Sequence, residues 1–554
     1  MKFQNIIVYL LFSISFSISA QDMKAYTSGW EGKIENTKTF NFSIEIAKFQ
    51  SENPIFIISN DQVIIEQSFK KIENKMIRID LGENLSFEGI VSENNNEING
   101  FIKSGILLYH IKLTKTKTDS FTGVWNILMV DKLKSQNFYL SLENGAGNNY
   151  QAYPVLGDNR FTGTWCANFQ KENDIIYFSD IKTGLKFKGK LGDQKIQLSI
   201  YLDRYLITQI ALNKSQADWQ IGNFKTDKQY KNHQNSKLDE LEYLISIDSL
   251  PNTHAILISK KGKTIYENYF DGYNSKIPHD TRSVSKSISS AIVGIAKDKS
   301  LFKNLDQSIF EFLPEKYQVS KDDLKHKIDF ISLLTMSSGL DAIDFGTTKE
   351  SKASEDSYQN SQDWTKTVVD ASMIHEPNKF ANYGSANPYL LGVAMDSIVS
   401  GSLEIFIDNN LFKKLGISNY IIQTDNIGRP YFGGGMYLTP KDMMKFGQLY
   451  LQKGKWENEQ VLSEQWIVNS FKNYRNLENT NDKNGYGFFW WHHTYQVNGK
   501  AIKSIEARGT GGQYIFVLPA LQTVVVITSG NYRNGKFQQP ELILEKYILP
   551  NIKE

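Results

Sequence analysis

A serine and a lysine one helical turn apart are the residues of this chain best placed to do chemistry. Ser283 and Lys286 lie in Thr281-Arg-Ser-Val-Ser-Lys286, and apolar residues recur at helical spacing from Val284 to Ile295. This pattern predicts a helix whose first turn presents both side chains on the same side. A serine hydroxyl needs a neighbour to accept its proton, and a lysine in a partly dry cleft, with its pKa lowered by burial, can do so.

The Ser-x-x-Lys spacing by itself is a weak signal. It occurs three more times in the chain, at Ser68–Lys71, Ser179–Lys182 and Ser300–Lys303. A serine that caps a helix, followed by a solvated lysine in the first turn, explains such spacing without any chemistry. Other parts of the chain must therefore bring further reactive groups to Ser283.

The C-terminal half, residues 238–554, is predicted to be a mixed α/β domain that could hold such groups. An entry helix is expected at 238–247, and a strand hairpin at 255–270. The remaining predicted elements are helices at 330–339 (stopped by Gly339), 388–398, 440–450 and 541–547, and two strands within 513–528.

Two further motifs follow in this half, and with the first they carry a family resemblance. They are Phe380-Ala-Asn-Tyr383-Gly-Ser385 and Arg508-Gly-Thr510-Gly-Gly-Gln513. Their order and spacing resemble the serine β-lactamase-related hydrolases: class C β-lactamases, DD-peptidases, family VIII carboxylesterases and 6-aminohexanoate-dimer hydrolases. The resemblance covers about residues 240–550. It implies a β-lactamase/transpeptidase-like domain with an antiparallel sheet, flanking helices and a helical subdomain.

The resemblance implies a role for each matching residue. Ser283 would be the acylated nucleophile, Lys286 its proton acceptor, and Tyr383 a base or relay whose pKa is lowered by the neighbouring ammonium. The backbone N–H of Gly512 would join that of Ser283 in an oxyanion hole. No metal or other cofactor is expected.

The substrate is expected to contact a second set of residues, namely Ser385, Thr510, Gly511, Gln513 and Trp490. For Trp490, within the aromatic run 486–491, a core position fits the sequence equally well. Ser385 replaces the family's asparagine, and Gly509 replaces the lysine or histidine that binds a substrate carboxylate. These two departures predict weak or absent β-lactamase activity. Arg508 is expected on the opposite side of its strand.

The N-terminal half predicts two tandem all-β units, barrels or sandwiches, at residues 21–118 and 119–220. Leu85-Ser-Phe87-Glu-Gly89 recurs as Leu185-Lys-Phe187-Lys-Gly189, a shift of 100 residues (185 − 85). Trp30, Trp125 and Trp165 fit either a sugar-stacking surface or the core of these units. A glycan or cell-wall contact is one expectation for this half.

Composition and the chain ends bound the remaining possibilities. Residues 1–20 predict a cleavable signal peptide, hence export to the periplasm or medium, and 221–237 predict a polar linker. The apolar run at the start is too short to span a membrane. A net charge of +2 without dense basic runs indicates no nucleic-acid partner, and the single cysteine, Cys166, excludes an intramolecular disulfide.

Taken together, the sequence predicts an exported multi-domain serine hydrolase. It would cleave a small ester, amide or peptide bond through an acyl-enzyme on Ser283. Two alternatives stay open: a DD-peptidase or D-aminopeptidase that acts on cell-wall peptides, and a non-catalytic, hydrolase-like binding protein whose β units dock a glycan.

Overall fold

The computed structural model describes Met23 and residues 25–70, 75–117, 119–145, 149–156, 166–215, 237–319, 323–480 and 484–552. The predicted signal peptide, and the predicted linker except Lys237, lie outside these residues. The chain divides into two compact units, residues 1–224 and 225–554, and each is described by itself.

The first unit is all-β, as predicted, and contains two antiparallel sheets. One sheet is a closed barrel of β1 (Gly29–Lys33), β10 (Asn137–Asn144), β11 (Tyr150–Leu156), β12 (Cys166–Glu172), β13 (Ile175–Asp180), β14 (Leu185–Gly192), β15 (Lys195–Leu202) and β16 (Tyr205–Ser215). The other contains β2 (Asn41–Ala47), β3 (Ile55–Ser59), β4 (Ile64–Ser68), β5 (Met76–Gly82), β6 (Leu85–Val91), β7 (Glu97–Ser104), β8 (Leu107–Lys117) and β9 (Ser120–Asn126). The two copies of the sequence repeat form equivalent strands, β6 and β14.

The boundary between the two sheets differs from the predicted one. Strand β1 pairs with β10 and β16, where Trp30 lies opposite Leu140 and Lys214. Strand β9 pairs with β2 and β8, where Trp125 lies opposite Phe42. The first strand of each predicted β unit (residues 21–118 and 119–220) therefore completes the sheet of the other predicted β unit. A division near Asp119 does not separate two independent sheets.

The aromatic residues proposed as a sugar-stacking surface belong to the core where the structure describes them. Trp30 and Trp125 are both 1% exposed. The indole N–H of Trp30 donates to the Tyr26 carbonyl (2.9 Å), and Trp125 stacks on Phe42 with ring centroids 5.2 Å apart. The sugar-stacking expectation is therefore wrong for these two residues, and Trp165 lies outside the described residues. Cys166, in β12, is buried.

The second unit is built on an eight-stranded antiparallel sheet. Its strands, in spatial order, are β18 (Lys263–Tyr269), β17 (Thr253–Lys260), β29 (Thr523–Ser529), β28 (Gln513–Leu518), β27 (Lys500–Gly509), β26 (Trp490–Val497), β25 (Gly485–Gly487) and β24 (Arg475–Asn476). Every residue of β28 and β29 is buried, which explains their continuous apolar sequences.

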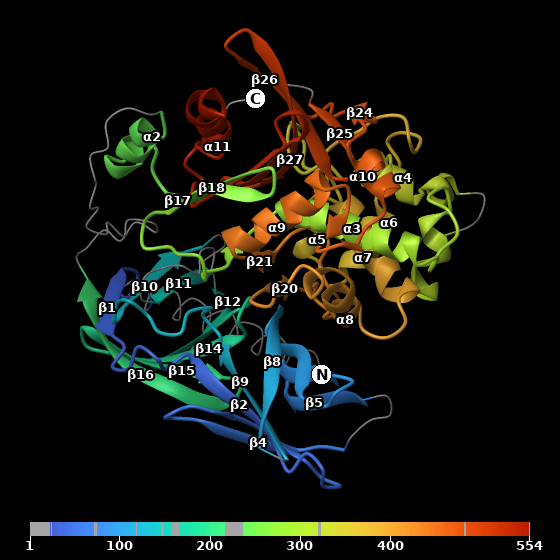
Figure 1. The fold of residues 1–554 in the computed structure, drawn as a ribbon. Coiled ribbons are helices and arrows are strands. Elements are labelled where there is room, and N and C mark those ends of the chain that lie inside the picture. The colour runs from blue at the N-terminus through green and yellow to red at the C-terminus, as the bar shows by residue number, and fades with distance from the viewer. Residues whose placement is uncertain are drawn as a thin grey trace, which may run out of the picture. The chain divides into compact units, whose positions relative to one another are not determined.

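Helices cover both faces of this sheet (Figure 1). On one face, α2 (Lys237–Ser246) and α11 (Gln539–Ile543) form a core with apolar residues of β17, β28 and β29. On the other face, α9 (Pro440–Leu451) packs against β28 and β29, and α3 (Val284–Asp298) against β27. The hairpin, the entry helix and these helices confirm the predicted mixed α/β domain. The predicted helix at 330–339 is shorter, because α4 ends at Leu334.

The remaining helices form the helical part of this unit. They are α4 (Phe330–Leu334), α5 (Glu355–Gln359), α6 (Trp364–Asp370), α7 (Ala386–Ile398), α8 (Leu403–Ile407) and α10 (Glu464–Ser470). Among three short strands of this unit, β21 (Met436–Leu438) pairs with both β19 (His279–Asp280) and β20 (Ile421–Gln423). Helix α7 contacts α3, α4 and α6. Within the described residues no single helix has the length and apolarity to cross a membrane; α7 and the α8 segment together pass that test, with a 94° bend between them.

Candidate active site

Ser283 is the residue immediately before helix α3, and its hydroxyl takes no part in capping that helix. Arg282, just before it, has φ of 50°, a conformation that non-glycine residues rarely adopt. Asp280 stabilises this turn, because its carboxylate accepts the Arg282 backbone N–H (3.0 Å) and pairs with the guanidinium (3.2 Å). The turn leaves the Ser283 hydroxyl available for chemistry.

Helix α3 is held at a fixed rotation by packing and by hydroxyl groups. Its predicted apolar face is fully buried (Val284, Ile288, Ala291, Ile292 and Ile295). The hydroxyl of Ser287 donates to the Phe489 carbonyl (2.7 Å), and that of Ser285 lies 2.9 Å from the Thr281 hydroxyl. Buried hydrogen bonds of this kind allow little rotation or sliding of the helix.

Lys286 lies directly beside the Ser283 hydroxyl. Its ammonium donates to Ser283 Oγ (2.9 Å) and to the Gly433 carbonyl, and it lies 5.2 Å from the centre of the Tyr383 ring. The residue is 1% exposed. The predicted convergence of hydroxyl, amine and phenol is therefore present in the structure.

Tyr383 is positioned by the loop that carries Asp344. Its backbone N–H donates to the Asn479 side chain (2.8 Å), and its carbonyl accepts the Asp344 N–H (3.2 Å). The Asp344 carboxylate in turn accepts the Ser385 N–H (2.8 Å) and hydroxyl (2.6 Å). Asp344 thus holds the Tyr383-Gly384-Ser385 turn on both sides. The Ser385 hydroxyl is used in this contact, and the predicted role of Ser385 in substrate binding is wrong.

Electrostatics reverses the predicted pKa direction of Lys286. Burial lowers the pKa of Lys286, but Tyr383, Glu355 and Asp344 raise it more, so that it lies above the ordinary lysine value. Burial also raises the pKa of Tyr383, and the Lys286 ammonium and a hydrogen bond to Ser283 offset only part of that rise. The resting site therefore holds an ammonium and a neutral phenol, and a base form appears as the pH rises.

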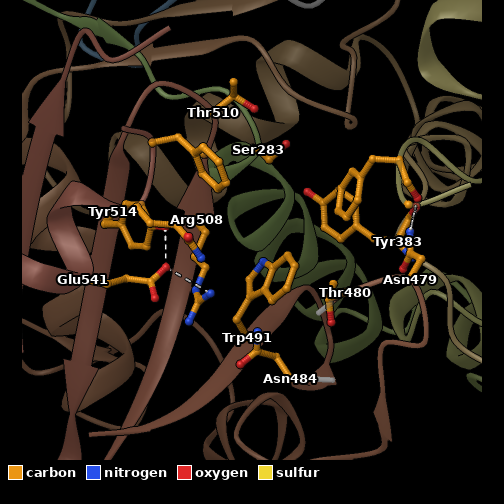
Figure 2. Close-up of a pocket in the computed structure, with 15 residues that line it drawn as sticks. Ser283, Tyr383, Asn479, Thr480, Asn484, Trp491, Arg508, Thr510, Tyr514 and Glu541 are labelled. Atoms are coloured by element: carbon orange, nitrogen blue, oxygen red, sulfur yellow. Dashed lines mark hydrogen bonds and ion pairs between the residues drawn. The ribbon is translucent and has the colours of Figure 1, made fainter. Parts of the chain in front are cut away.

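A cavity of about 470 Å³ opens onto these groups (Figure 2). Ser283, Tyr383 and Thr510 line it. The other lining residues are Phe345, Gly346, Asn479, Thr480, Asn484, Trp491, Arg508, Gly509, Tyr514, Phe537, Gln538 and Glu541. Within the described part of the chain, no group of three or more histidine, cysteine, aspartate or glutamate side chains is placed to hold a metal ion.

The glycine-rich turn between β27 and β28 differs from its predicted role. Gly511 and Gly512 have φ of 86° and 88°, which suits glycine. The Gly512 N–H donates to the Gly509 carbonyl within the turn (3.2 Å), and Gly512 is not among the residues that line the cavity; its place in an oxyanion hole stays a prediction. The Gln513 amide is buried and donates to the Ser529 carbonyl, so Gln513 does not contact the cavity. Gly511 supplies backbone to the turn and does not line the cavity.

Gly509 takes the place of the basic side chain that the family resemblance leads us to expect, and the structure gives a physical reason for its absence. A Cβ atom at this position would lie 2.4 Å from the Thr281 carbonyl oxygen. The end of β27 thus packs directly against the backbone that leads to Ser283. This close contact places the glycine-rich turn near Ser283, and it leaves no room at position 509 for a side chain that could bind a carboxylate.

The tryptophan that lines the cavity is Trp491, not the predicted Trp490. Trp490 is 0% exposed and packs against Phe446 and Tyr450, whereas Trp491 lines the cavity. Successive residues of a strand point to opposite faces, so only one of the pair can reach the cavity. The prediction for Trp490 is wrong, and the core alternative is correct.

Arg508 and Glu541 line the cavity, and the sequence did not predict either position. Arg508 was expected to point away by strand parity; the cavity reaches round the end of β27 to the face covered by α11, and so includes it. Its guanidinium pairs with Glu506 (2.7 Å from Nε and 2.6 Å from Nη2) and with Glu541 (3.2 Å from Nη1). Burial raises the pKa of Glu541 and Arg508 opposes that rise. No motif marked Glu541 in the sequence.

Comparison with known proteins places this unit in a family. A family model described as Beta-lactamase matches residues 253–545. Similar solved structures include a class C β-lactamase from Rhodobacter sphaeroides (14% identity over 55% of this chain and 97% of that one, TM-score 0.42). A penicillin binding protein from Bacillus halodurans (16%, 54% and 97%, 0.43) and EstCE1, a hydrolase with promiscuous acyltransferase activity (17%, 55% and 95%, 0.44), are also similar.

Proposed function

The chain belongs to the β-lactamase family of serine hydrolases, and we propose that it cleaves an ester or amide bond through an acyl-enzyme on Ser283. One observation carries this proposal: the Lys286 ammonium lies 2.9 Å from Ser283 Oγ, at the wall of a cavity that Tyr383 also lines. A hydroxyl with an adjacent base is the arrangement required of a serine nucleophile.

The reaction divides into acylation and deacylation. Ser283 Oγ attacks the substrate carbonyl carbon, and its proton passes to the base form of the Lys286–Tyr383 pair. The tetrahedral intermediate collapses, and the same proton is returned to the departing alcohol or amine. Water then attacks the acyl-enzyme, gives up a proton to the pair, and releases the carboxylic acid as Ser283 regains its proton.

The substrate we propose is an ester, small amide or peptide, with weak or absent β-lactamase activity. Two features support this choice. Gly509 supplies no cation for a carboxylate, and a side chain there would collide with the Thr281 carbonyl. The Ser385 hydroxyl is used by Asp344 (2.6 Å) and is not presented to a ligand. Export of the enzyme, proposed from residues 1–20, would place it among substrates outside the cytoplasm.

Acylation can be tested directly with a fluorophosphonate probe followed by intact-mass measurement. We expect one adduct on the wild-type protein and none on Ser283→Ala. Ser300→Ala is the matched control, because Ser300 and Lys303 have the same spacing but Ser300 is exposed. Full labelling of Ser283→Ala would show that another residue is the nucleophile.

Turnover separates an enzyme from a hydrolase-like binding protein. We expect p-nitrophenyl acetate hydrolysis by the wild-type protein, and loss of at least ~100-fold in kcat for Lys286→Ala, the usual range for removal of a general base. A folded wild-type protein without Ser283-dependent turnover would favour the binding protein.

A further inference from the structure

The cavity has a second chemical feature besides the nucleophile. Figure 2 shows Tyr514, Arg508 and Glu541 gathered on the side of the cavity away from Tyr383. They come from β28, β27 and α11 respectively. We call these three residues the Glu541 wall, and none of them takes part in the proton transfers described above.

The charges of this wall do not cancel. Within the group of Arg508, Glu506 and Glu541, one guanidinium faces two carboxylates, and Glu506, which is 0% exposed, takes the closer contacts at 2.7 and 2.6 Å. Glu541 receives a single guanidinium contact, at 3.2 Å. The group of three side chains therefore carries one net negative charge, and that charge lies on the carboxylate that lines the cavity.

Glu541 has capacity for another partner. The Tyr514 hydroxyl donates to its Oε1 (2.7 Å), and Arg508 contacts the same oxygen. Among the described residues no hydrogen bond reaches Oε2, and the side chain keeps 14% of its surface exposed. Burial raises the pKa of this carboxylate, and Arg508 and the Tyr514 hydrogen bond oppose that rise.

Three classes of ligand group can be compared at this wall. A carboxylate would meet the negative charge of Glu541 while Glu506 already occupies the guanidinium. An apolar group would remove water from Glu541 without replacing its hydrogen bonds, which is unfavourable for a charged group. A primary ammonium would supply both a hydrogen bond and the missing positive charge.

We propose that Glu541, backed by Arg508 and Tyr514, forms a subsite for a primary ammonium group of the substrate. The inference rests on the proposed function, since the same cavity contains Ser283. It narrows the substrate class to esters, amides or short peptides that carry a free amino group. N-acylated forms of such substrates lack the charge and are poorer ligands.

Competitive inhibition tests this subsite without knowledge of the natural substrate. The probes are n-butylammonium, n-butanol and butyrate, which are similar in size and differ in charge, and the assay is p-nitrophenyl acetate hydrolysis. For the wild-type protein we expect an inhibition constant for n-butylammonium about tenfold below that of n-butanol, with butyrate the weakest. The ratio of the first two constants is the readout.

Variants of the wall must change this ratio in a defined way. Glu541→Gln is expected to raise this ratio close to one, and Gln538→Lys is expected to raise it towards one as well, because it places an internal ammonium beside Glu541. Tyr514→Phe removes a hydrogen bond but no charge, and should retain the preference for the ammonium. Thermal unfolding identifies any variant that fails to fold, and Gln538→Lys keeps the test valid if Glu541→Gln does so.

The outcomes separate this inference from the proposed function. A wild-type ratio near one, or an unchanged ratio in both Glu541→Gln and Gln538→Lys, overturns the ammonium subsite while Ser283-dependent turnover stands. If no turnover exists, the hydrolase proposal fails. Ligand-observed NMR of n-butylammonium and n-butanol with Ser283→Ala then still measures the preference.

Discussion

Asp344 offers a sharp test of how the site is built, because it holds the catalytic turn without lining the cavity. Its carboxylate accepts the Ser385 N–H (2.8 Å) and hydroxyl (2.6 Å) on one oxygen and the Glu355 N–H (2.9 Å) on the other. The variant Asp344→Asn keeps the size of the side chain but has one acceptor oxygen instead of two. Whichever way the amide is oriented, an NH2 group faces a backbone N–H that has lost its acceptor.

The size of the effect follows from that loss. A buried donor left without a partner costs about 1–3 kcal/mol. If the turn relieves this by moving Tyr383 out of position, kcat falls roughly 5- to 150-fold, at ~1.36 kcal/mol for each factor of ten. KM should change little, because Asp344 does not line the cavity.

Steady-state hydrolysis of p-nitrophenyl acetate, together with thermal unfolding, measures this effect. Asp341→Asn is the matched control: Asp341 lies in the same loop, and its carboxylate bonds to Ser351 and the Lys352 N–H, not to the catalytic turn. We expect the control to retain most of its kcat. Wild-type kcat in folded Asp344→Asn, or an equal loss in both variants, would refute the positioning role of Asp344.

Three further predictions concern charge, backbone and packing. Because the raised pKa of Lys286 keeps it protonated at neutral pH, acylation should accelerate as the pH rises; Glu355→Gln removes a charge that raises this pKa, so the rising limb of the pH–rate profile should move to lower pH, and an upward or absent shift would contradict this. Gly509→Lys should not create carboxylate binding but should lower the unfolding temperature, since its Cβ would lie 2.4 Å from the Thr281 carbonyl; a variant of normal stability would contradict the proposed close contact. Ile292→Ala, on the buried face of α3, should lower the free energy of unfolding by about 2–5 kcal/mol in a denaturant titration. A loss below about 1 kcal/mol would contradict this, because it would mean that neighbouring side chains fill the space left by Ile292.

Local pattern was sufficient to predict the elements around the nucleophile. The apolar spacing after Val284 identified α3, and the three motifs identified the segments that converge on Ser283. These features depend on residues close together in the chain. The strand runs of β28 and β29 were predictable for the same reason, since both faces are buried and the runs are continuously apolar.

The wrong predictions depend on contacts between distant parts of the chain. Trp490 and Trp491 are adjacent and chemically alike, and only the packing of α9 and its neighbours decides which one faces the cavity. The pKa of Lys286 is raised first by Tyr383, which a motif marks, and then by Glu355 at the start of α5 and by Asp344, which no motif marks. Burial by itself lowers the pKa of Lys286, and the prediction from the sequence took only burial into account. It therefore had the opposite direction to the one found in the structure.

The pairing of β1 in the barrel has a consequence for how the N-terminal unit is made. This strand leaves the ribosome first among the described strands, yet its partners β10 and β16 begin at Asn137 and Tyr205. Until they are synthesised, β1 is an unpaired strand edge, which is prone to association with other chains. Deletion of β1 would leave β10 and β16 as the two edges of an open sheet, because each strand would lose one pairing partner.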